Sequence, residues 1–514
     1  MRDRPDQRIR GSNGGRPRRS EGRDDTPGSR HYANGRSHPS AQLDALTVVS
    51  WGARAHTPDG EGAVPIFLIR RGRLPKTKAT DHEEPEPFLT LIVTLLFVLT
   101  IAYALGYLAL SRKPATPPTP GDGRRPFAVF VVPCLDEELV IGASLDRLAA
   151  IPGDDSAVLV IDDGSSDRTS EIVRNRLSDR VWLLRREAPD ARQGKGEALN
   201  HAYQVLRDGV LSGRFGDRTP DEIVVVVLDA DGRVEHDVLD HTLPWFADPR
   251  IGAVQIGVRM YNADQGLLPR LQDMEFVTYL DIFQRARHRL GSSGLGGNGQ
   301  FTRLSALMGL GDKPWTTCLT EDLDLGVRLL TMGWRNAFCP TTHVRQQAVT
   351  ELDRLLRQRT RWFQGHLQCM TLVPSIIRSN RLTARAAFDL ALTLQGAVLV
   401  LVTSIACAGL AAVLMAAVLS GSADTLLPNR EGADMVAVIA GWYLLAFGLA
   451  PLYASIYRRH EPTIGYPRAL WLGHVYSLYG YLWFASGWRA VARLVTGRDG
   501  WAKTRRTVDV PSGA

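Results

Sequence analysis

The chain has 514 residues, of which 44% are hydrophobic, and it carries a formal net charge of +7 at pH 7. This length allows two or three structural units. A basic balance is typical of proteins that bind nucleic acid, anionic lipid or phosphate-bearing substrates. Arginines flank the apolar segments, which favours a membrane and phosphate. The sequence contains no zinc-finger spacing, RNA-recognition signature or basic zipper that would indicate nucleic acid.

The N-terminal region, residues 1–86, is rich in Arg, Gly, Ser, Pro and Asp and shows almost no hydrophobic periodicity. This composition predicts a disordered basic segment. The region lacks the leading apolar block of a signal peptide, and an alternative is that the true start of the protein lies further along. The five cysteines form no CxxC pair, which predicts reduced thiols and a catalytic part that faces the cytoplasm.

Long apolar runs predict several membrane-spanning helices. Residues 88–110 contain no charge, and about 20 such residues cross the hydrocarbon core of a bilayer. Residues 351–385 place apolar side chains at helical spacing among arginines, which predicts interfacial amphipathic helices. Further runs within 390–490 predict C-terminal transmembrane helices, and residues 491–514 form a basic tail. We therefore expect a multi-pass protein of the plasma membrane.

The orientation of the last segments is open. Arg458 and Arg459 fit a cytoplasmic loop, and so does the basic tail, yet the apolar run 469–488 separates them. Either that run is re-entrant or interfacial, or the positive-inside rule is broken. The Arg-rich N-terminus raises the same conflict with the first predicted span.

Between residues 125 and 350 the pattern changes to alternating strands and helices. Apolar runs predict strands at 127–132, 157–161, 181–184 and 223–228, with helices at 136–150 and about 195–207. Buried strands separated by helices are typical of an α/β domain with a mostly parallel sheet covered on both faces. Ligands of such domains bind beyond the carboxyl ends of the strands.

Two acidic clusters directly follow predicted strands. Asp162 and Asp163 begin a Gly/Ser turn, where carboxylates can accept hydrogen bonds from a base or a sugar; an ordinary turn with a helix N-cap is the alternative. Asp229 and Asp231 have the i, i+2 spacing that puts two strand side chains on one side. Adjacent carboxylates favour a hard cation such as Mg²⁺ or Mn²⁺, which shares oxygen ligands with phosphates, although a solvated turn has the same sequence.

Two further clusters lie at predicted helices. Glu321 and Asp322 open a helix, where acidic side chains complement the helix dipole; a carboxylate here can also act as general base on an acceptor hydroxyl. In the segment QRTRW, Arg361 can neutralise a leaving diphosphate and Trp362 can stack on a sugar ring. Alternatively, both can anchor an interfacial helix at the membrane.

The order and spacing of these clusters resemble one known family. The segments are PCLDEE (133–138), VIDDGSSD (160–167), GKGEALN (194–200), LDAD (228–231), GGNGQF (296–301), TED (320–322) and QRTRW (358–362). Together they resemble the inverting glycosyltransferase family 2, and within it the processive branch of cellulose, hyaluronan, chitin and poly-N-acetylglucosamine synthases. The segment GGNGQF differs from cellulose and hyaluronan synthases, which leaves the sugar and the linkage open.

The resemblance implies a nucleotide-sugar-binding domain of the GT-A type with flanking transmembrane and interfacial helices. Asp163, with Pro133 and Glu137 nearby, would hold the uridine of a UDP-sugar. Lys195 would approach the nucleotide or its diphosphate. The pair Asp229 and Asp231 would bind the diphosphate and a Mg²⁺ or Mn²⁺ ion.

The acceptor side follows from the same resemblance. Asp322 would be the catalytic base. Gln358, Arg361 and Trp362 would close over the diphosphate and the acceptor, and Gly297 and Asn298 would line the acceptor site. In a single displacement, the deprotonated acceptor hydroxyl would attack the anomeric carbon and invert it from α to β.

These roles predict a membrane-bound inverting hexosyltransferase that extends a β-linked polysaccharide from a UDP-sugar. One alternative is a glycolipid synthase that adds one or a few sugars to a membrane lipid. Another is a non-catalytic membrane scaffold or transporter subunit. The expected partners are a UDP-sugar, a glycan or lipid acceptor and membrane lipid, without nucleic acid.

Overall fold

The computed structural model describes residues 45–55, 62–72, 85–112, 116–117, 124–421 and 433–498. The chain divides into two compact units, Met1–Glu83 and Glu84–Ala514. Most of the basic tail 491–514 lies outside the described residues.

In the first unit, β1 (Ala45–Ala55) pairs antiparallel with β2 (Gly62–Gly72). The prediction of disorder across 1–86 thus does not describe these two segments, and the remainder of 1–83 lies outside the described residues. β1 contains Thr, Trp and two Val, and β2 contains Val, Phe and two Ile, all of which favour strands, and the average composition of the region obscured them.

The second unit contains a mixed sheet of eight strands within its described part, in the order β5-β4-β3-β6-β9-β8-β10-β7. Six strands run in one direction, whereas β9 and β7 run oppositely. The predicted mostly parallel α/β sheet is therefore confirmed. The strands are β3 (Phe127–Cys134), β4 (Ser156–Asp162), β5 (Val181–Arg185), β6 (Ile223–Val227), β7 (Arg233–Val234), β8 (Ile251–Met260), β9 (Gln300–Arg303) and β10 (Arg335–Gln346).

Both faces of the sheet are buried. Along β3, Phe130 and Val132 belong to one apolar core, whereas Val129 and Val131 belong to the other. This alternation follows from the period of two in a strand and explains why the sequence of a central strand is continuously apolar. The helices around the sheet are α2 (Ile141–Ala149), α3 (Thr169–Arg174), α4 (Lys195–Leu211), α5 (Val238–Thr242), α6 (Leu267–Tyr279), α7 (Arg285–Leu290), α8 (Leu304–Met308) and α9 (Glu321–Thr331).

Short helical turns complete the domain. They are η1 (Pro220–Glu222), η2 (Leu243–Ala247), η3 (Ala263–Gln265), the π-helical turn η4 (Leu280–Gln284) and, after helix α10 (Leu352–Cys369), η5 (Met370–Leu372). The helix expected at 136–150 begins only at Ile141, because residues 135–140 form a loop at the end of β3. This loop matters for the site described below.

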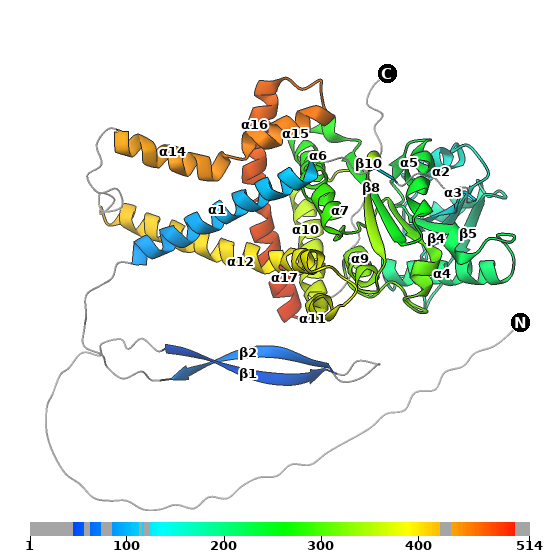
Figure 1. Cartoon of the computed structure of the whole chain (residues 1–514), viewed down its shortest axis with the longest axis horizontal. Coiled ribbons are helices and arrows are strands. Elements are labelled where there is room, and N and C mark those ends of the chain that lie inside the picture. The colour runs from blue at the N-terminus through cyan, green and yellow to red at the C-terminus, as the bar shows by residue number, and fades with distance from the viewer. Residues whose placement is uncertain are drawn as a thin grey trace, which may run out of the picture. The chain divides into compact units, whose positions relative to one another are not determined.

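Long apolar helices flank the domain, and α1 (Pro85–Ser111) lies beside α12 (Ala384–Leu419) in Figure 1. Three segments of the described chain are long and apolar enough to cross a membrane: Thr90–Ser111, Ala384–Leu419 and Met435–His460. The third segment comprises most of α14 (Ala433–Phe447) and all of α15 (Ala450–His460). Large apolar side chains on these helices are exposed, which is unfavourable in water and expected in lipid.

The last apolar run, 469–488, forms parts of two shorter helices, α16 (Tyr466–Tyr479) and α17 (Leu482–Val495). Helix α17 packs closely on α10 (Leu352–Cys369): a Cβ on Gly487 would lie 2.9 Å from Phe363. This run is not among the candidate spans of the described residues. The short helix α11 (Val373–Arg378) connects α10 and η5 to α12.

Candidate active site

One cavity of about 640 Å³ lies where β3, β4 and β6 end. Because these are adjacent parallel strands, their carboxyl ends meet at one edge of the sheet, where α/β domains bind ligands. Eleven of the residues predicted to form the site line this cavity: Pro133, Glu137, Asp163, Lys195, Asp229, Gly297, Asn298, Asp322, Gln358, Arg361 and Trp362.

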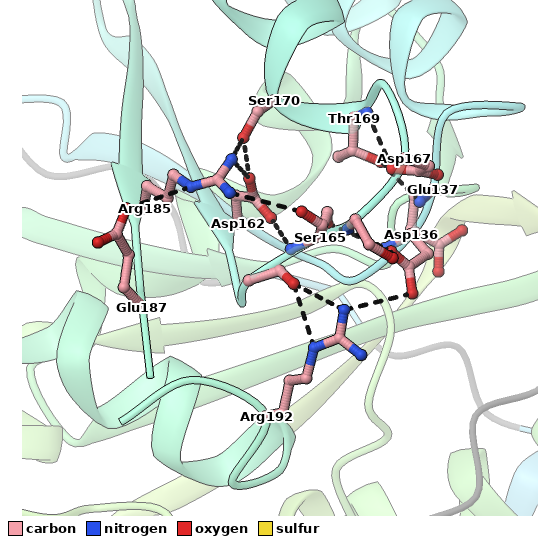
Figure 2. A network of polar contacts seen from close by, with 12 residues as sticks. Asp136, Glu137, Asp162, Ser165, Asp167, Thr169, Ser170, Arg185, Glu187 and Arg192 are labelled. Atoms are coloured by element: carbon pink, nitrogen blue, oxygen red, sulfur yellow. Dashed lines mark hydrogen bonds and ion pairs between the residues drawn. The ribbon is translucent and has the colours of Figure 1, made fainter. Parts of the chain in front are cut away.

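Two loops that follow β3 and β4 are joined by hydrogen bonds (Figure 2). The backbone N–H of Glu137 donates to Thr169 Oγ1 at 2.8 Å. The carboxylate of Asp167 accepts from the backbone N–H of Thr169 at 2.9 Å and from that of Glu138 at 3.0 Å. These bonds fix the loop that carries Glu137 beside the loop that carries Asp163.

Asp162 has a structural environment. It is fully buried and accepts hydrogen bonds from Ser165 N at 2.8 Å, from Arg185 Nη1 at 3.1 Å and from the hydroxyl of Ser170 (Figure 2). A carboxylate with this many donors stabilises a turn. The ordinary-turn interpretation therefore applies to this aspartate.

Asp163 differs from its neighbour because it lines the cavity. Its Oδ1 accepts from Arg186 Nη1 at 2.6 Å. Burial raises the pKa of Asp163, whereas a backbone N–H bond at Arg192 and the Arg186 cation lower it. The result is a well-positioned carboxylate at one end of the cavity that can accept a hydrogen bond from a ligand.

Lys195 lies among carboxylates at the centre of the cavity. Its Nζ donates to Asp229 Oδ1 and to the carbonyl of Gly297, both at 2.8 Å, and lies 3.6 Å from Glu321 Oε1. Burial lowers the pKa of Lys195, but the charges of Asp229, Glu321 and Asp322 raise it more, so the amine is a permanent cation. A Cβ on Gly297 would lie 3.1 Å from Nζ and 3.2 Å from Asp322 Oδ2, so glycine permits this close packing.

Asp322 lies in the first turn of α9 and faces the same centre. Its Oδ1 accepts from the backbone N–H of Leu323 at 2.8 Å. Burial and the adjacent charge of Glu321 raise the pKa of Asp322 to about 7, against the opposing effect of Lys195. A carboxylate that titrates near neutral pH has the proton affinity that a general base needs.

Asn298 connects three segments of the site through hydrogen bonds. Its Oδ1 accepts from Asp229 N at 3.1 Å, and its Nδ2 donates to Gln346 Oε1 at 2.8 Å. The carbonyl of Asn298 accepts from Gln255 Nε2 at 2.9 Å. These bonds support a positioning role for Asn298, and its predicted contact with an acceptor stays a prediction.

The strand geometry assumed for the i, i+2 spacing does not hold at Asp229 and Asp231. Strand β6 ends at Val227, and Asp229 begins a turn closed by the bond from Gly232 N to Asp229 O at 2.7 Å, so strand alternation does not apply. Asp231 is buried, accepts from Gln347 N at 2.9 Å and is not among the residues that line the cavity.

The oxygen donors suit a divalent ion only in part. Among the described residues there is no group of three or more His, Cys, Asp or Glu side chains that could hold a metal. Two aspartates are the protein share typical of Mg²⁺ sites that complete their coordination with water and substrate phosphates. Asp229, which lines the cavity, therefore fits an ion that binds together with a diphosphate, and a part for Asp231 in that site stays a prediction.

The segment QRTRW lies on α10, and Gln358, Arg361 and Trp362 of this segment line the cavity. Arg359, which the sequence did not single out, is buried and pairs with Glu275. Its guanidinium also lies 4.1 Å from the centre of the Trp362 ring. Arg359 thus holds the Trp362 ring in the wall of the cavity through a cation–π contact.

Beyond Trp362 the cavity continues as a largely apolar extension, which we call the lane. Its walls come from α10, α12 and α17 and include Phe363, Leu390, Gly396, Ala397, Val400 and Trp483. The lane thus connects the carboxylates of the centre with α12, a helix that is long and apolar enough to cross a membrane.

Several residues of the site were missed by sequence reasoning. Arg186 follows β5 at the same sheet edge as the acidic clusters, so its position after a predicted strand was an available signal. Arg287 and Gln255 line or support the cavity from helix and strand segments without a local motif. Only the tertiary fold brings these two side chains to the site.

Comparison with known proteins agrees with this geometry. Residues 125–365 match the family described as Glycosyltransferase like family 2. The beta-monoglucosyldiacylglycerol synthase of Trichormus variabilis is 32% identical over 304 residues, which cover 57% of this chain and 61% of that protein. The synthase of the same name from Synechocystis sp. is 34% identical over 286 residues, with 53% and 56% covered. The match thus spans less than two thirds of either relative.

A solved structure is similar across more of the chain. The mannosyltransferase PcManGT from Pyrobaculum calidifontis, in complex with GDP-Man and Mn²⁺, has a TM-score of 0.54 and 20% identity, with 80% of this chain and 99% of that chain covered. At this identity the likeness concerns the fold.

The domain between β3 and β10 therefore has the GT-A α/β fold of glycosyltransferases. The match to the glycosyltransferase family 2 model spans 241 residues (365 − 125 + 1 = 241), just under half of the 514 in the chain. The predicted kinship with the processive branch is not supported by these relatives, whose names describe synthases of a glucosylated lipid.

Proposed function

We propose that the protein is a membrane-bound inverting glycosyltransferase that transfers a sugar from a nucleotide-diphosphate sugar to a hydroxyl of a membrane lipid. The observation that carries this proposal is the lane: one cavity joins the Lys195–Asp229–Asp322 centre to an apolar wall of α12. The two glucosyldiacylglycerol synthases named above support a lipid acceptor of the same kind.

The chemistry of the lane favours a lipid over a growing polysaccharide. A sugar polymer carries many hydroxyls, and a passage for it needs hydrogen-bonding groups along its length. Along α12 the lane presents mainly apolar side chains such as Leu390, Ala397 and Val400, beside a few polar ones from α7 and α12, among them Arg287 and Thr393. An acyl chain loses no hydrogen bonds on such a surface and gains about 0.8 kcal/mol per buried methylene. A polysaccharide synthase is therefore the second candidate. It is kept because the QRTRW segment resembles the processive synthases.

The donor would lie along the wall formed by Pro133, Glu137 and Asp163. Asp163 accepts a hydrogen bond from the base, for which the imide N–H of uracil is suited. The cation of Lys195 attracts the diphosphate, and Arg361 neutralises the charge that grows on it as the bond to the sugar breaks. When bound, a Mg²⁺ or Mn²⁺ ion held by Asp229 and Asp231 supplies further charge neutralisation to the leaving diphosphate.

The acceptor would approach from the lane, on the other side of the sugar. Asp322 takes the proton of the lipid hydroxyl as its oxygen attacks the anomeric carbon, and the nucleoside diphosphate leaves from the opposite face. One displacement converts an α-linked donor into a β-glycoside. We place this domain on the cytoplasmic side of the plasma membrane, where nucleotide sugars are made.

The test uses the purified full chain in phosphatidylcholine vesicles, with or without diacylglycerol, and a panel of radiolabelled UDP-sugars. We expect label in the organic phase only when diacylglycerol is present. Label in water-soluble material of high mass would support the polysaccharide synthase and overturn the lipid acceptor. A chain that binds no labelled nucleotide sugar would revive the non-catalytic scaffold or transporter subunit.

A further inference from the structure

A buried polar cluster lies on the lane, and the roles proposed so far do not use it. Arg287 of α7 lines the cavity, is 7% exposed, and donates from Nη1 to the hydroxyl of Tyr279 at 2.8 Å. Its Nε lies 3.7 Å from Asp389 Oδ2 on α12. The same Asp389 oxygen accepts from Ser292 Oγ at 2.6 Å. The hydroxyl of Tyr103 on α1 also interacts with this guanidinium.

The cluster has unused hydrogen-bonding capacity. Among the described residues, Arg287 Nε, Ser293 Oγ, Thr393 Oγ1 and Asp389 Oδ1 are buried without a hydrogen-bond partner. Arg287, Ser293 and Thr393 line the cavity, whereas Asp389 lies behind Arg287. Buried polar atoms normally have partners, so three such residues that line one cavity indicate a ligand that supplies them.

The charges of the cluster indicate the class of ligand. Arg287 Nε and Asp389 Oδ2 lie 3.7 Å apart as a base and an acid, so the pair adds no net charge to the lane when both are ionised. A phosphate group would need a cation without such compensation, because a buried unbalanced charge is costly. Ester carbonyls and hydroxyls, in contrast, accept from Arg, Ser and Thr without bringing charge.

We propose that Arg287, with Ser293 and Thr393, binds the neutral ester-and-hydroxyl backbone of a glycerolipid acceptor, and that Asp389 is a positioning residue that keeps this site neutral. The inference rests on the proposed function, and it specifies the acceptor: the acyl chains lie along α12 and the glycerol backbone is held at Arg287. The free hydroxyl is then directed towards Asp322.

Steady-state kinetics on the full chain in vesicles test this site. We expect Arg287→Gln to raise the KM for diacylglycerol by about tenfold or more, the usual effect of losing a hydrogen bond to a charged group. The KM for the nucleotide sugar should not change. Arg287→Lys should recover part of the loss. Arg289→Gln removes the same charge from an exposed position on the same helix and should leave both KM values unchanged.

The variant Asp389→Asn distinguishes a lipid-binding site from a cluster that only connects α1 and α12 to the domain. This variant leaves the Arg287 cation uncompensated, so phosphatidic acid should become a stronger competitor of diacylglycerol by several fold. The double variant Arg287→Gln, Asp389→Asn should lose that gain. Unchanged competition and unchanged acceptor KM, with only a lower melting temperature, would show that the cluster merely ties α1 and α12 to the domain.

Photolabelling measures binding of the acceptor lipid without requiring sugar transfer. A photoreactive diacylglycerol should label the wild type on α10 or α12, and Arg287→Gln should reduce that labelling. If the wild type makes no glycolipid, the proposed function fails. Labelling that is equal in wild type and variant overturns the Arg287 site even when glycolipid is made.

Discussion

The raised pKa of Asp322 leads to a prediction for the pH dependence of a Glu321 variant. The adjacent Glu321 carboxylate is one of the causes that raise this pKa. Glu321→Gln removes that negative charge and should lower the pKa of Asp322. Because a general base must be deprotonated, activity falls as pH drops through the pKa, so the variant should remain active at lower pH than the wild type.

The size of the effect follows from titration. With a pKa of about 7, roughly 9% of Asp322 is deprotonated at pH 6. A neighbouring charge commonly shifts a carboxyl pKa by about one unit. Such a decrease would raise the deprotonated fraction at pH 6 to roughly 50%, which is about fivefold more activity relative to the plateau.

The assay is kcat/KM for the donor between pH 5.5 and 9, measured by release of the nucleoside diphosphate. Lys195→Gln is the matched opposite, because losing the cation should raise the pKa of Asp322 and move the acid limb to higher pH. An acid limb that stays in place in Glu321→Gln, or moves upward, would refute the assignment of the limb to Asp322.

Other variants test separate parts of the site. Asp322→Asn should slow sugar transfer by about 10²- to 10⁴-fold while the donor still binds, and transfer at the wild-type rate would remove Asp322 as the base. Excess EDTA should abolish transfer, with activity restored by added Mn²⁺ or Mg²⁺; full activity in EDTA would contradict a metal on Asp229 and Asp231. Arg359→Ala leaves Glu275 without its cation, so it should destabilise the protein by about 3–5 kcal/mol. Arg357→Ala, which breaks an exposed pair on the same helix, should change stability by about 1 kcal/mol or less in detergent unfolding, and equal effects would contradict the burial argument.

The sequence predicted the part of the fold where local pattern and tertiary structure agree. The valine run of β6 and the apolar runs of β3 and β4 are buried on both faces, and such strands are continuously apolar. β8 and β10 were not predicted, because Gln255 in β8 and Pro340 followed by Thr341 and Thr342 in β10 interrupt the apolar pattern. The identities of these residues depend on their contacts in the folded domain and not on the local strand pattern.

The site was predictable where side chains follow strands. Asp163 and Asp229 line the cavity as expected from strand ends. For Asp231 the strand argument does not apply, because β6 ends at Val227, and its role as a ligand stays a prediction. Arg287 and Asp389 are 102 residues apart in sequence (389 − 287 = 102) and meet only through the packing of α7 on α12. No local pattern could have indicated that contact.

The identity of the glycosylated product tests the central claim most directly. The full chain in diacylglycerol vesicles is incubated with the UDP-sugar that it turns over, and the product is analysed by mass spectrometry and by the anomeric proton coupling. Transfer by inversion from an α-linked donor predicts a lipid that carries one or a few hexoses with a β-configured anomeric carbon. A ladder of long oligosaccharides, or an α-linked glycolipid, would contradict it.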